Sequence, residues 1–524
     1  MIAETIIGQA PIEENLKQFL LVLAVSLSVA TLPQVFSWFR QIPYTLLLVI
    51  VGLCLAFLDV RLVNLSPNLI LLIFLPPLLF EAAWNLQWDK LKKDLFPISL
   101  YAILGVIISV VGIGFALNKF AGISLAIALL LGATLSATDP VSVIALFREM
   151  GVEKRLAVLM EGESLFNDGI AVIAFTFLVG FSLGTDDIAI PNLIGRFLLF
   201  VGIGIGVGCL IGFGISYLTQ RFDLPLVEQS LTFVSAYGTY IITEDLGGSG
   251  VIGVVTMGLI LGNFGSLIGM QPSTRLAVTQ FWDFLAFFVN SMVFLLIGDQ
   301  IKFADLGANL GLIAITIGAM LLTRAIAIFS LGWLSNWLTG SNISLPNQTV
   351  LWWGGLRGSV SIALALSVPS ILSERTDIIA TVFGVVLFTL LVQGLTIKPL
   401  LEKLGLLTEQ TILQKYWEAV ARWVALNRVQ NYLTQANTRP EIEPEFCRYQ
   451  EALVEGQLKQ IQQEINQMRN ENSHLRSFAQ EQLQKELIAI EADTYAEFLR
   501  SGKLGNKLSP LLQETYKNIA ENLS

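Results

Sequence analysis

The chain has 524 residues, of which 54% are hydrophobic and only 14% are charged, and its formal net charge is −9. Soluble proteins carry about 25% charged residues, so this composition excludes an ordinary soluble protein and indicates a polytopic membrane protein. Three cysteines without paired spacing and a single histidine, His474, argue against a disulfide framework and against histidine-based metal binding or proton transfer in the membrane.

Apolar segments that cross a membrane need roughly 17 to 25 residues. The sequence contains about thirteen such segments, and polar residues interrupt the fifth, so we predict an all-α membrane domain. The predicted spans are 16–36, 42–58, 66–86, 95–118, 122–147, 156–181, 190–218, 227–245, 250–268, 277–298, 307–337, 347–370 and 377–400.

Lys and Arg residues in the connecting loops predict the orientation, because cytoplasmic loops carry an excess of them. With the N-terminus outside, nine basic residues lie on the inner side and six on the outer side, which predicts an external N-terminus and a cytoplasmic tail. The first fifteen residues contain acids but no base, unlike a signal peptide, so we expect the first span to be retained. The inner residues are Arg40, Lys90, Lys92, Lys93, Arg148, Lys154, Arg155, Arg221 and Arg275; the outer ones are Lys17, Arg61, Lys119, Arg196, Lys302 and Arg375.

The third and fifth spans both combine proline with an acid. In LPPLLFEAAWNL, two prolines precede Glu81 near the inner end of the span, and in GATLSATDPVSVIALF, Pro140 follows Thr138 and Asp139. Proline removes a helical hydrogen bond and clashes with the preceding turn, so we predict a broken helix at Thr138 and Asp139. Such a break is tolerated only inside protein or beside a wet cavity, where freed carbonyls and the Thr138 hydroxyl are oxygen ligands and Asp139 offsets a helix N-terminus. An ordinary proline kink is the alternative.

The sixth span, which contains EGESLFNDGIAVIAF, carries three carboxyl groups from Glu161 onward. A charge at the bilayer centre costs roughly 2.5 to 3.5 kcal/mol, so acids kept at that depth indicate a functional site. Ser164 and Asp168 are four residues apart and share one face, while Glu163 lies behind Asn167 on the next face. The alternative for Asp168 and Glu163 is a neutralised acid that only packs helices, whereas Glu161 lies near the cytoplasmic end, where water can solvate it.

Two arginines lie in later apolar spans. Arg357 is surrounded by glycines in WWGGLRGSVSIALALS, and Arg324 lies in LLTRAIAIFSLGW. A membrane-buried arginine needs a carboxylate partner, and Glu163 is the candidate, because Asp168 must remain free if it binds an ion. Charge counting leaves open which of the two arginines pairs with Glu163.

The composition changes to Glu, Gln, Lys, Asn and Arg after about residue 404. We therefore predict a transmembrane domain over 1–404 and a helical cytoplasmic tail over 405–524. Apolar residues at helical spacing favour a short coiled coil or a docked amphipathic helix, and a solvated tail is the alternative. These apolar residues are Leu458, Ile461, Ile465 and Met468.

Four motifs in order, ATDPVSV, GESLFNDG, YGTYIITEDLGGSGVIGVVTMGLILGN and GGLRGSVSIAL, resemble signatures of the sodium/proton antiporters of the NhaP and NHE type. The resemblance covers about residues 15–404 and leaves the tail out. It implies an NhaA-like fold of inverted repeats with crossed broken helices, in a homodimer. It also implies that Asp168 binds the ion, that Asn167 marks an electroneutral transporter, and that Ser164, Glu81 and the Thr138 backbone complete the Na⁺ shell.

The same resemblance implies two roles outside the ion shell. Asp139 matches the acid that compensates helix ends where the broken helices cross, and Glu163 and Arg357 match a structural ion pair. The implied activity is Na⁺ or Li⁺ exchange for H⁺ in the cell membrane, which serves pH and sodium homeostasis and salt tolerance. Transported Na⁺ and H⁺ and the lipid bilayer are the expected partners, without nucleic acid or a bound cofactor.

Competition for one carboxyl group is sufficient for exchange. Burial favours the neutral, protonated carboxyl, while Na⁺ stabilises the charged form, so the two ligands exclude each other at Asp168. No GxxxxGK[ST] motif supplies nucleotide energy, and no HExxH motif indicates an intramembrane hydrolase, so we do not expect an enzyme. Potassium/proton exchange and a cation channel are the remaining alternatives, because oxygen ligands do not by themselves set ion size.

Overall fold

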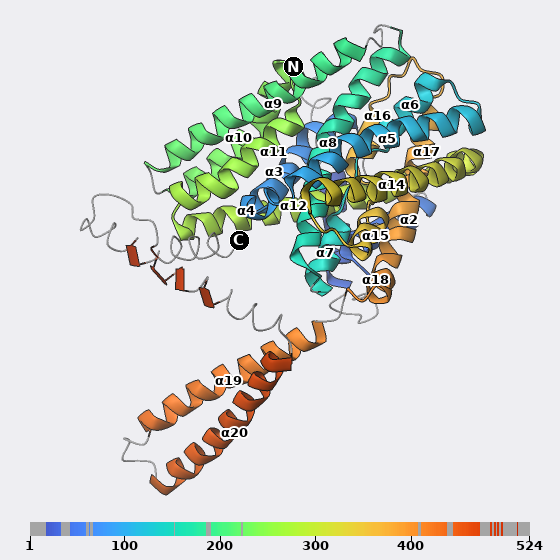
Figure 1. Cartoon of the computed structure of the whole chain (residues 1–524). Helices are drawn as coiled ribbons and strands as arrows, with labels where there is room; N and C mark the ends of the chain where they lie inside the picture. Colours follow the sequence, from blue (N-terminus) through green and yellow to red (C-terminus); the bar gives the residue numbers. More distant parts are fainter. Residues whose placement is uncertain are drawn as a thin grey trace, which may run out of the picture. The chain divides into compact units, whose positions relative to one another are not determined.

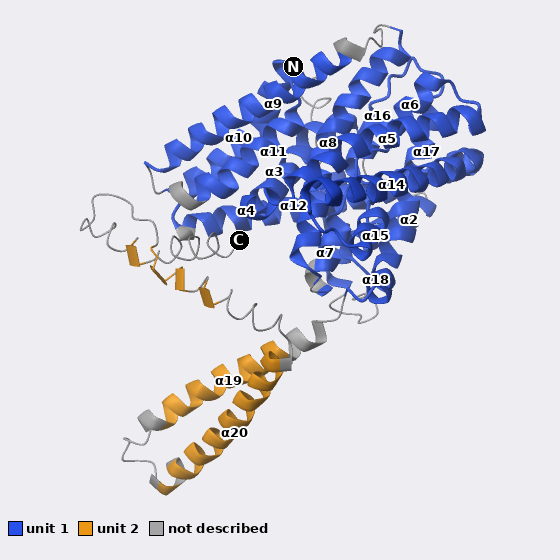
Figure 2. Cartoon of the chain, viewed as in Figure 1, with its two compact units in different colours: residues 1–406 blue, residues 407–524 orange. Residues whose placement is uncertain are grey.

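The computed structural model describes residues 17–32, 42–58, 62, 66–150, 152–184, 190–221, 224–406, 410–436 and 444–471, with short pieces at 483–484, 487–488, 490–491, 494–495 and 511. Across these described residues every regular element is a helix, as predicted (Figure 1). The chain forms two compact units, Met1–Leu406 and Leu407–Ser524, coloured separately in Figure 2. Arg40, Arg61 and His474 lie outside the described residues.

A helix lies in each of the thirteen predicted ranges, and six helical segments are long and apolar enough to cross a membrane. The exact number of crossings therefore stays a prediction. The long helices are α5 (Leu95–Ala121), α8 (Lys154–Ser182), α9 (Ile190–Thr219), α12 (Pro272–Asp299), α14 (Leu310–Thr339) and the continuous segment α17 (Arg375–Phe388), η4 (Thr389–Gln393) and α18 (Gly394–Lys403). The others are Lys17–Leu32, α2 (Tyr44–Phe57), η2 (Leu69–Phe74), α3 (Leu75–Asn85), α4 (Trp88–Leu91), α10 (Pro225–Asp245), α11 (Gly250–Ile260), η3 (Leu261–Gly269) and α13 (Phe303–Ala308).

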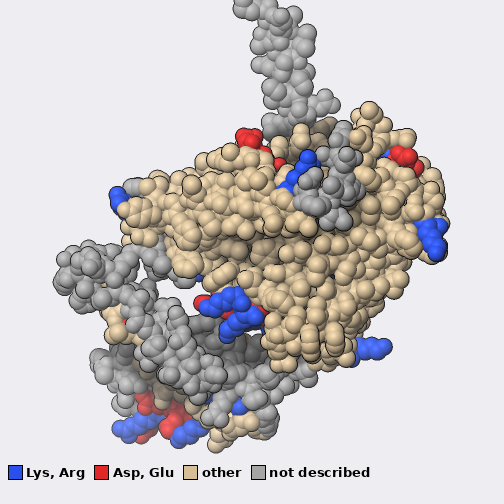
Figure 3. Space-filling model, turned by 45° about the horizontal axis from the view of Figure 1, so that its top comes forward, with Lys and Arg blue, Asp and Glu red and all other residues tan. Residues whose placement is uncertain are grey.

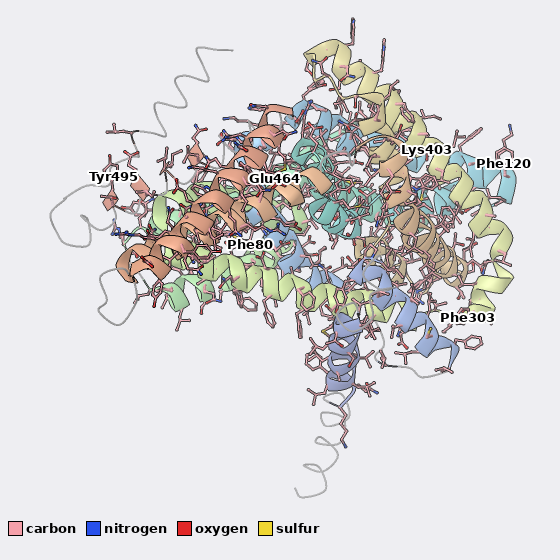
Figure 4. The ribbon with its side chains drawn as sticks, turned by 90° about the horizontal axis from the view of Figure 1, so that it is seen from below. Phe80, Phe120, Phe303, Lys403, Glu464 and Tyr495 are labelled. Carbon is pink, nitrogen blue, oxygen red and sulfur yellow. The ribbon has the colours of Figure 1, made fainter. Side chains whose placement is uncertain are left out.

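The outer surface of the first unit is apolar, as expected for helices that face lipid. Leu210 is 75% exposed and Leu226 is 77% exposed. Most of the face in Figure 3 lacks charged side chains, which stand in small groups. In Figure 4, Phe120 and Phe303 lie at the margin of the helices, whereas the fully buried Phe80 lies among them. This distribution is that of a multi-pass membrane protein.

Two helical spans are interrupted. The fifth predicted span consists of α6 (Leu125–Thr134) and α7 (Val141–Met150), and the twelfth consists of α15 (Leu345–Trp353) and α16 (Ser359–Leu366). The first interruption ends at Pro140, in agreement with the predicted break. The second contains three glycines, whose missing side chains allow the two interruptions to approach each other.

Among the described residues, three π-helical segments, which the sequence analysis did not predict, widen other spans. η2 ends immediately before α3, whose second and third residues are Pro76 and Pro77. Pro77 has no amide hydrogen to donate to the Ile73 carbonyl, and the Tyr237 hydroxyl of α10 donates to that oxygen instead, at 2.9 Å. The third span therefore crosses two prolines while its freed carbonyl remains hydrogen-bonded.

The second unit contains an antiparallel helical hairpin of α19 (Gln410–Ala436) and α20 (Pro444–Glu471), seen in Figure 1. Trp423 Nε1 donates to Gln462 Oε1 at 2.8 Å across the hairpin. Of the predicted apolar stripe on α20, Leu458 is buried, and Ile461, Ile465 and Met468 are half-buried. The tail is thus helical over its described part, while its role stays a prediction.

Candidate cation-binding site

The first interruption is held by polar side chains of α8. Ser164 Oγ donates to the Thr138 carbonyl oxygen. Asn167 Nδ2 donates to Thr138 Oγ1 at 2.6 Å, and Asn167 Oδ1 accepts from the Thr138 amide at 3.3 Å. All three residues are buried. The Asn167 side chain thus hydrogen-bonds through both its nitrogen and its oxygen to Thr138 in the interruption. Asn167 and Thr138 therefore lie next to the predicted ion site and stabilise the broken helix there.

Asp168 lies one turn beyond Ser164 on the same face of α8, as predicted. Its side chain lines a cavity of about 670 Å³ together with Ser164 and Glu81. The residue is 9% exposed, and Oδ1 has no hydrogen-bond partner among the described residues. A buried carboxyl oxygen without a partner carries a large free-energy cost that a proton or a cation removes.

The cavity lies between α3, α7, α8, α12 and α16 and has a strongly acidic lining. Among the described residues, five carboxyl groups line it and no Lys, Arg or His does. Carboxylate, carbonyl and hydroxyl oxygens are ligands for hard cations, and the described residues contain no cluster of three His, Cys, Asp or Glu suited to a tightly held metal. The lining acids are Glu81, Asp139, Glu161, Asp168 and Asp283.

Asp139 lies where the two interrupted helices cross. Its backbone amide donates to the Leu356 carbonyl in the second interruption at 2.8 Å. Its Oδ1 accepts from the Val141 amide, the first residue of α7, at 3.1 Å, and its carboxyl group lies against Gly358, immediately before α16. A single acid thus faces the positive ends of two half-helices.

Arg357 lies at the negative, C-terminal end of a half-helix, whereas Asp139 lies at the positive, N-terminal ends. The side chain is 1% exposed, and its Nη1 donates to the carbonyls of Ser136 and Ala137 at 3.1 and 2.9 Å, just beyond the C-terminus of α6. A guanidinium at this point satisfies carbonyls that the helix break has freed and offsets the negative end of α6.

The predicted ion pair between Glu163 and Arg357 is wrong, because Glu163 pairs with Arg324. Arg324 Nη1 and Nη2 donate to Glu163 Oε1 and Oε2 at 3.0 and 3.3 Å. Arg324 also donates to the carbonyls of Leu351 and Trp352 at 2.9 and 3.2 Å, at the end of α15. The Arg357 guanidinium donates instead to the carbonyls beyond α6. Glu163 on α8 therefore forms its ion pair with Arg324 on α14.

Asn85 links Glu81 to Asp283, and the sequence analysis singled out neither Asn85 nor Asp283. Asn85 Nδ2 donates to Glu81 Oε1 at 2.6 Å and to Asp283 Oδ1 at 3.2 Å. The spacing of Glu81 and Asn85 by four residues was a visible signal for their contact. Asp283 was also visible as an acid inside a predicted span, whereas its contact with α3 depends on the tertiary fold.

Comparison with known proteins shows the family of the chain. The family model described as "Sodium/hydrogen exchanger, transmembrane" matches residues 23–403. The chain is 64% identical over 515 residues to "Na(+)/H(+) antiporter ApNhaP" of Aphanothece halophytica, covering 98% of this chain and 99% of that protein. It is 56% identical over 515 residues to "Low-affinity Na(+)/H(+) antiporter NhaS1" of Synechocystis sp., covering 97% and 98%, respectively.

A solved structure shares the fold of the first unit. The structure of the sodium proton antiporter MjNhaP1 from Methanocaldococcus jannaschii matches 73% of this chain and 99% of its own, with a TM-score of 0.59 and 21% identity. The family match covers both interrupted spans, α8 and the acidic cavity. The chain belongs to the sodium/hydrogen exchanger family.

Proposed function

We propose that the protein is a secondary transporter that exchanges Na⁺ for H⁺ at Asp168. The observation that carries the proposal is the buried Asp168 Oδ1, which lines an acidic cavity without a hydrogen-bond partner among the described residues. The names of the two relatives identify those proteins as Na⁺/H⁺ antiporters. Their similarity over nearly the whole chain favours sodium over potassium as the cation here.

Exchange follows from competition between two ligands for one carboxyl group. A proton on Asp168 removes the charge that would hold Na⁺, and bound Na⁺ stabilises the carboxylate that would take a proton. Ser164 Oγ lies beside Asp168 in the cavity and can supply a neutral oxygen ligand. Glu81 lines the same cavity and is the second charged candidate for the Na⁺ shell.

Crossed broken helices give the site a polar backbone at membrane depth without exposing it to lipid. In transporters of this kind, alternating access moves a loaded site past a barrier, and an empty charged carboxylate cannot cross. Asp139 and Arg357 compensate the ends of the half-helices. Asp168 is not needed for that purpose and can exchange a proton for Na⁺. We infer that the structural polar groups stay paired while only Asp168 is loaded and unloaded.

We infer a stoichiometry of one Na⁺ for one H⁺. Residue 167 is an asparagine whose amide donates to and accepts from Thr138 and does not ionise, so the pair at positions 167 and 168 contains one titratable group. A protonated Asp168 and a Na⁺-loaded Asp168 then carry the same charge. A cation channel would also use acids and broken helices, but its cation flux would not move protons in the opposite direction.

The wider setting is part of the same proposal. We place the transporter in the cell membrane as a homodimer, with its N-terminus outside and its tail in the cytoplasm. In this setting it would export sodium and regulate internal pH, without enzymatic chemistry or a bound cofactor.

The decisive experiment uses purified protein in proteoliposomes with a pH-sensitive dye inside. Sodium added outside should dissipate an imposed pH gradient with the wild-type protein, and Asp168→Asn should abolish that response, because an amide neither ionises nor holds Na⁺ with a full charge. Asp377→Asn, which removes an exposed acid from α17, is the matched control and should retain exchange. Exchange by Asp168→Asn at more than a few percent of the wild-type rate would falsify the assignment, and K⁺-driven but not Na⁺-driven flux would identify a potassium/proton exchanger.

A further inference from the structure

Helix α19 of the second unit has two apolar sides. One side packs against α20, with Ala419 buried and Trp423 hydrogen-bonded to Gln462 (Figure 1). A row of residues at spacings of three and four, which we call the outer stripe, lies on another side of α19 and is exposed throughout. The outer stripe consists of Trp417, Ala421, Val424, Arg428 and Tyr432.

The composition of the outer stripe is unusual for a helix surface in water. Trp417 is 42% exposed, Val424 is 39% exposed and Tyr432 is 57% exposed. Arg428 is the charged residue among the five. A helix of a soluble hairpin normally places charged and polar residues on the side away from its partner helix, so an apolar second side indicates a second contact.

Charge distinguishes α19 from α20. The sequence of α19 contains three bases and one acid, whereas that of α20 contains three bases and five acids. The side chains of Arg422 and Arg428 are both exposed on α19. A basic helix with an apolar stripe has the composition that binds an anionic lipid surface.

The aromatic residues lie at the two ends of the outer stripe. Trp417 and Tyr432 are fifteen residues apart, which corresponds to about 22 Å along the helix. Trp and Tyr are enriched where proteins meet lipid headgroups, because each has an apolar ring and one polar group. With these rings at the headgroups, Ala421 and Val424 between them contact the upper part of the acyl chains.

The chain connection to the membrane unit is short. Only six residues, 404–409, join α19 to α18, which is the last part of a helical segment long and apolar enough to cross a membrane. Such a short tether gives the outer stripe a high effective concentration at the lipid surface, so a weak affinity is enough for docking.

A second copy of α19 fits the outer stripe less well than lipid does. If two outer stripes packed together, Arg428 would be buried without an acid on either stripe to pair with it, and an uncompensated buried charge is costly. The phosphate group of an anionic lipid supplies that opposite charge. The charge of the outer stripe therefore favours a lipid surface over a copy of the same helix.

We propose that α19 docks through the outer stripe on the surface of an anionic lipid bilayer. Docking holds α19 at the headgroups, while the excess of acids on α20 keeps that helix in water. The inference goes beyond Na⁺/H⁺ exchange and does not depend on it, because no residue of the outer stripe lines the acidic cavity.

Thiol labelling of the full-length protein in lipid nanodiscs tests the docking. Ala421→Cys places a thiol in the outer stripe, and mass spectrometry of its peptide follows the reaction with a neutral, water-soluble maleimide. This thiol should react about tenfold more slowly in nanodiscs rich in phosphatidylglycerol than in nanodiscs of phosphatidylcholine, because lipid excludes the reagent and disfavours the reactive thiolate. Added salt should reverse much of this difference, since it screens the attraction between the bases and the lipid.

Ala452→Cys is the matched control. It makes the same substitution at an exposed alanine of α20, on the helix that we expect to remain in water. Its labelling rate should agree within about twofold between the two lipids, because neither lipid covers it. An equal slowing of Ala421→Cys and Ala452→Cys would show a general effect of the lipid on labelling and would overturn the docking of the outer stripe.

Substitution of Val424 tests the outer stripe itself. Val424→Glu, combined with Ala421→Cys, should restore fast labelling in phosphatidylglycerol, because it places an acid against an anionic surface. Val424→Leu keeps the outer stripe apolar and should leave labelling slow. Both changes lie at an exposed position, so the melting temperature in detergent should match that of the parent protein.

Two results would contradict the proposal. Equal labelling of Ala421→Cys in the two lipids would show that the outer stripe does not dock on anionic lipid. Slow labelling in both lipids that salt does not change would identify a protein partner, such as a second copy of the chain, as the occupant of the outer stripe.

Discussion

Asp168 and Glu163 lie five residues apart on α8, yet the fold gives them different environments. Glu163 accepts two hydrogen bonds from the Arg324 guanidinium and is 3% exposed, whereas Asp168 lines the cavity. The Glu163 carboxyl group is thus satisfied by its ion pair, whereas Asp168 Oδ1 has no hydrogen-bond partner among the described residues. We therefore propose that the partner of each acid, and not its depth, separates a structural Glu163 from an ion-binding Asp168.

Glu163→Gln is expected to destabilise the protein more than it changes transport. Removing one partner of a buried ion pair leaves the other charge uncompensated, at a cost of typically 3 to 5 kcal/mol. Arg324→Gln should cost at least as much, because it also frees the carbonyls of Leu351 and Trp352. Thermal unfolding in detergent measures this effect, with the exposed Glu455→Gln of α20 as a control expected to melt as wild type. A stable Glu163→Gln protein with weakened Na⁺ affinity would instead make Glu163 an ion ligand.

At the scale of elements, sequence patterns located the helices and one break better than they located the contacts between helices. Pro140 predicted the first interruption because the missing amide hydrogen is a local property. The partner of Glu163 was not predictable, because Arg324 and Arg357 are both compatible with charge counting and only the packing of α14 decides between them. The contact between Asp283 and Asn85 was not predictable for the same reason, because it joins residues almost two hundred positions apart.

Gly358 is expected to be indispensable where the two interruptions cross. A β-carbon at this position would collide with the Asp139 carboxyl group, which faces α7 and α16. Gly358→Ala should therefore displace Asp139 and reduce exchange by more than about tenfold, since misplaced site residues commonly cost this much or more. Gly238→Ala in α10, where no atom lies near the added carbon, should transport as wild type. Comparable rates for the two variants in dye-loaded proteoliposomes would show that the crossing tolerates movement.

At the scale of the whole molecule, the family match ends before the helical tail. The family match covers residues 23–403, and the archaeal structure matches 73% of this chain while 99% of its own length is used. The relatives from Aphanothece halophytica and Synechocystis sp. align over the tail as well. The family model does not extend over residues 407–524, and we propose that exchange needs only the first unit.

Removal of residues 407–524 is expected to leave exchange intact. All residues of the acidic cavity lie in the first unit, so the truncated protein should keep Na⁺-dependent proton flux within about threefold of the full chain per molecule inserted. Asp168→Asn in the truncated chain is the negative control. Complete loss of flux from a truncated protein that inserts and melts normally would assign the tail an obligatory role in transport.

Membrane voltage is expected to have no effect on the direction of exchange. A one-for-one exchange moves no net charge, so a potential worth about 2.3 kcal/mol per 100 mV for each charge neither drives nor opposes it. Valinomycin with a potassium gradient imposes the potential on sodium-loaded proteoliposomes. A Na⁺ flux that reverses at a voltage-dependent ratio of the two ion gradients would show that a second charge travels, and Glu81→Gln would be the first variant to examine.

The acidic cavity also determines what kind of small molecule can inhibit the protein. Its volume of about 670 Å³ falls within the range of pockets that hold drug-sized ligands, and its lining combines five carboxyl groups with apolar side chains such as Leu79 and Phe287. A compact organic cation with an aromatic body would match both features, whereas any anionic compound would be repelled. Competitive inhibitors of this transporter are therefore expected among guanidinium- and amine-bearing molecules, and their potency should fall as the sodium concentration rises.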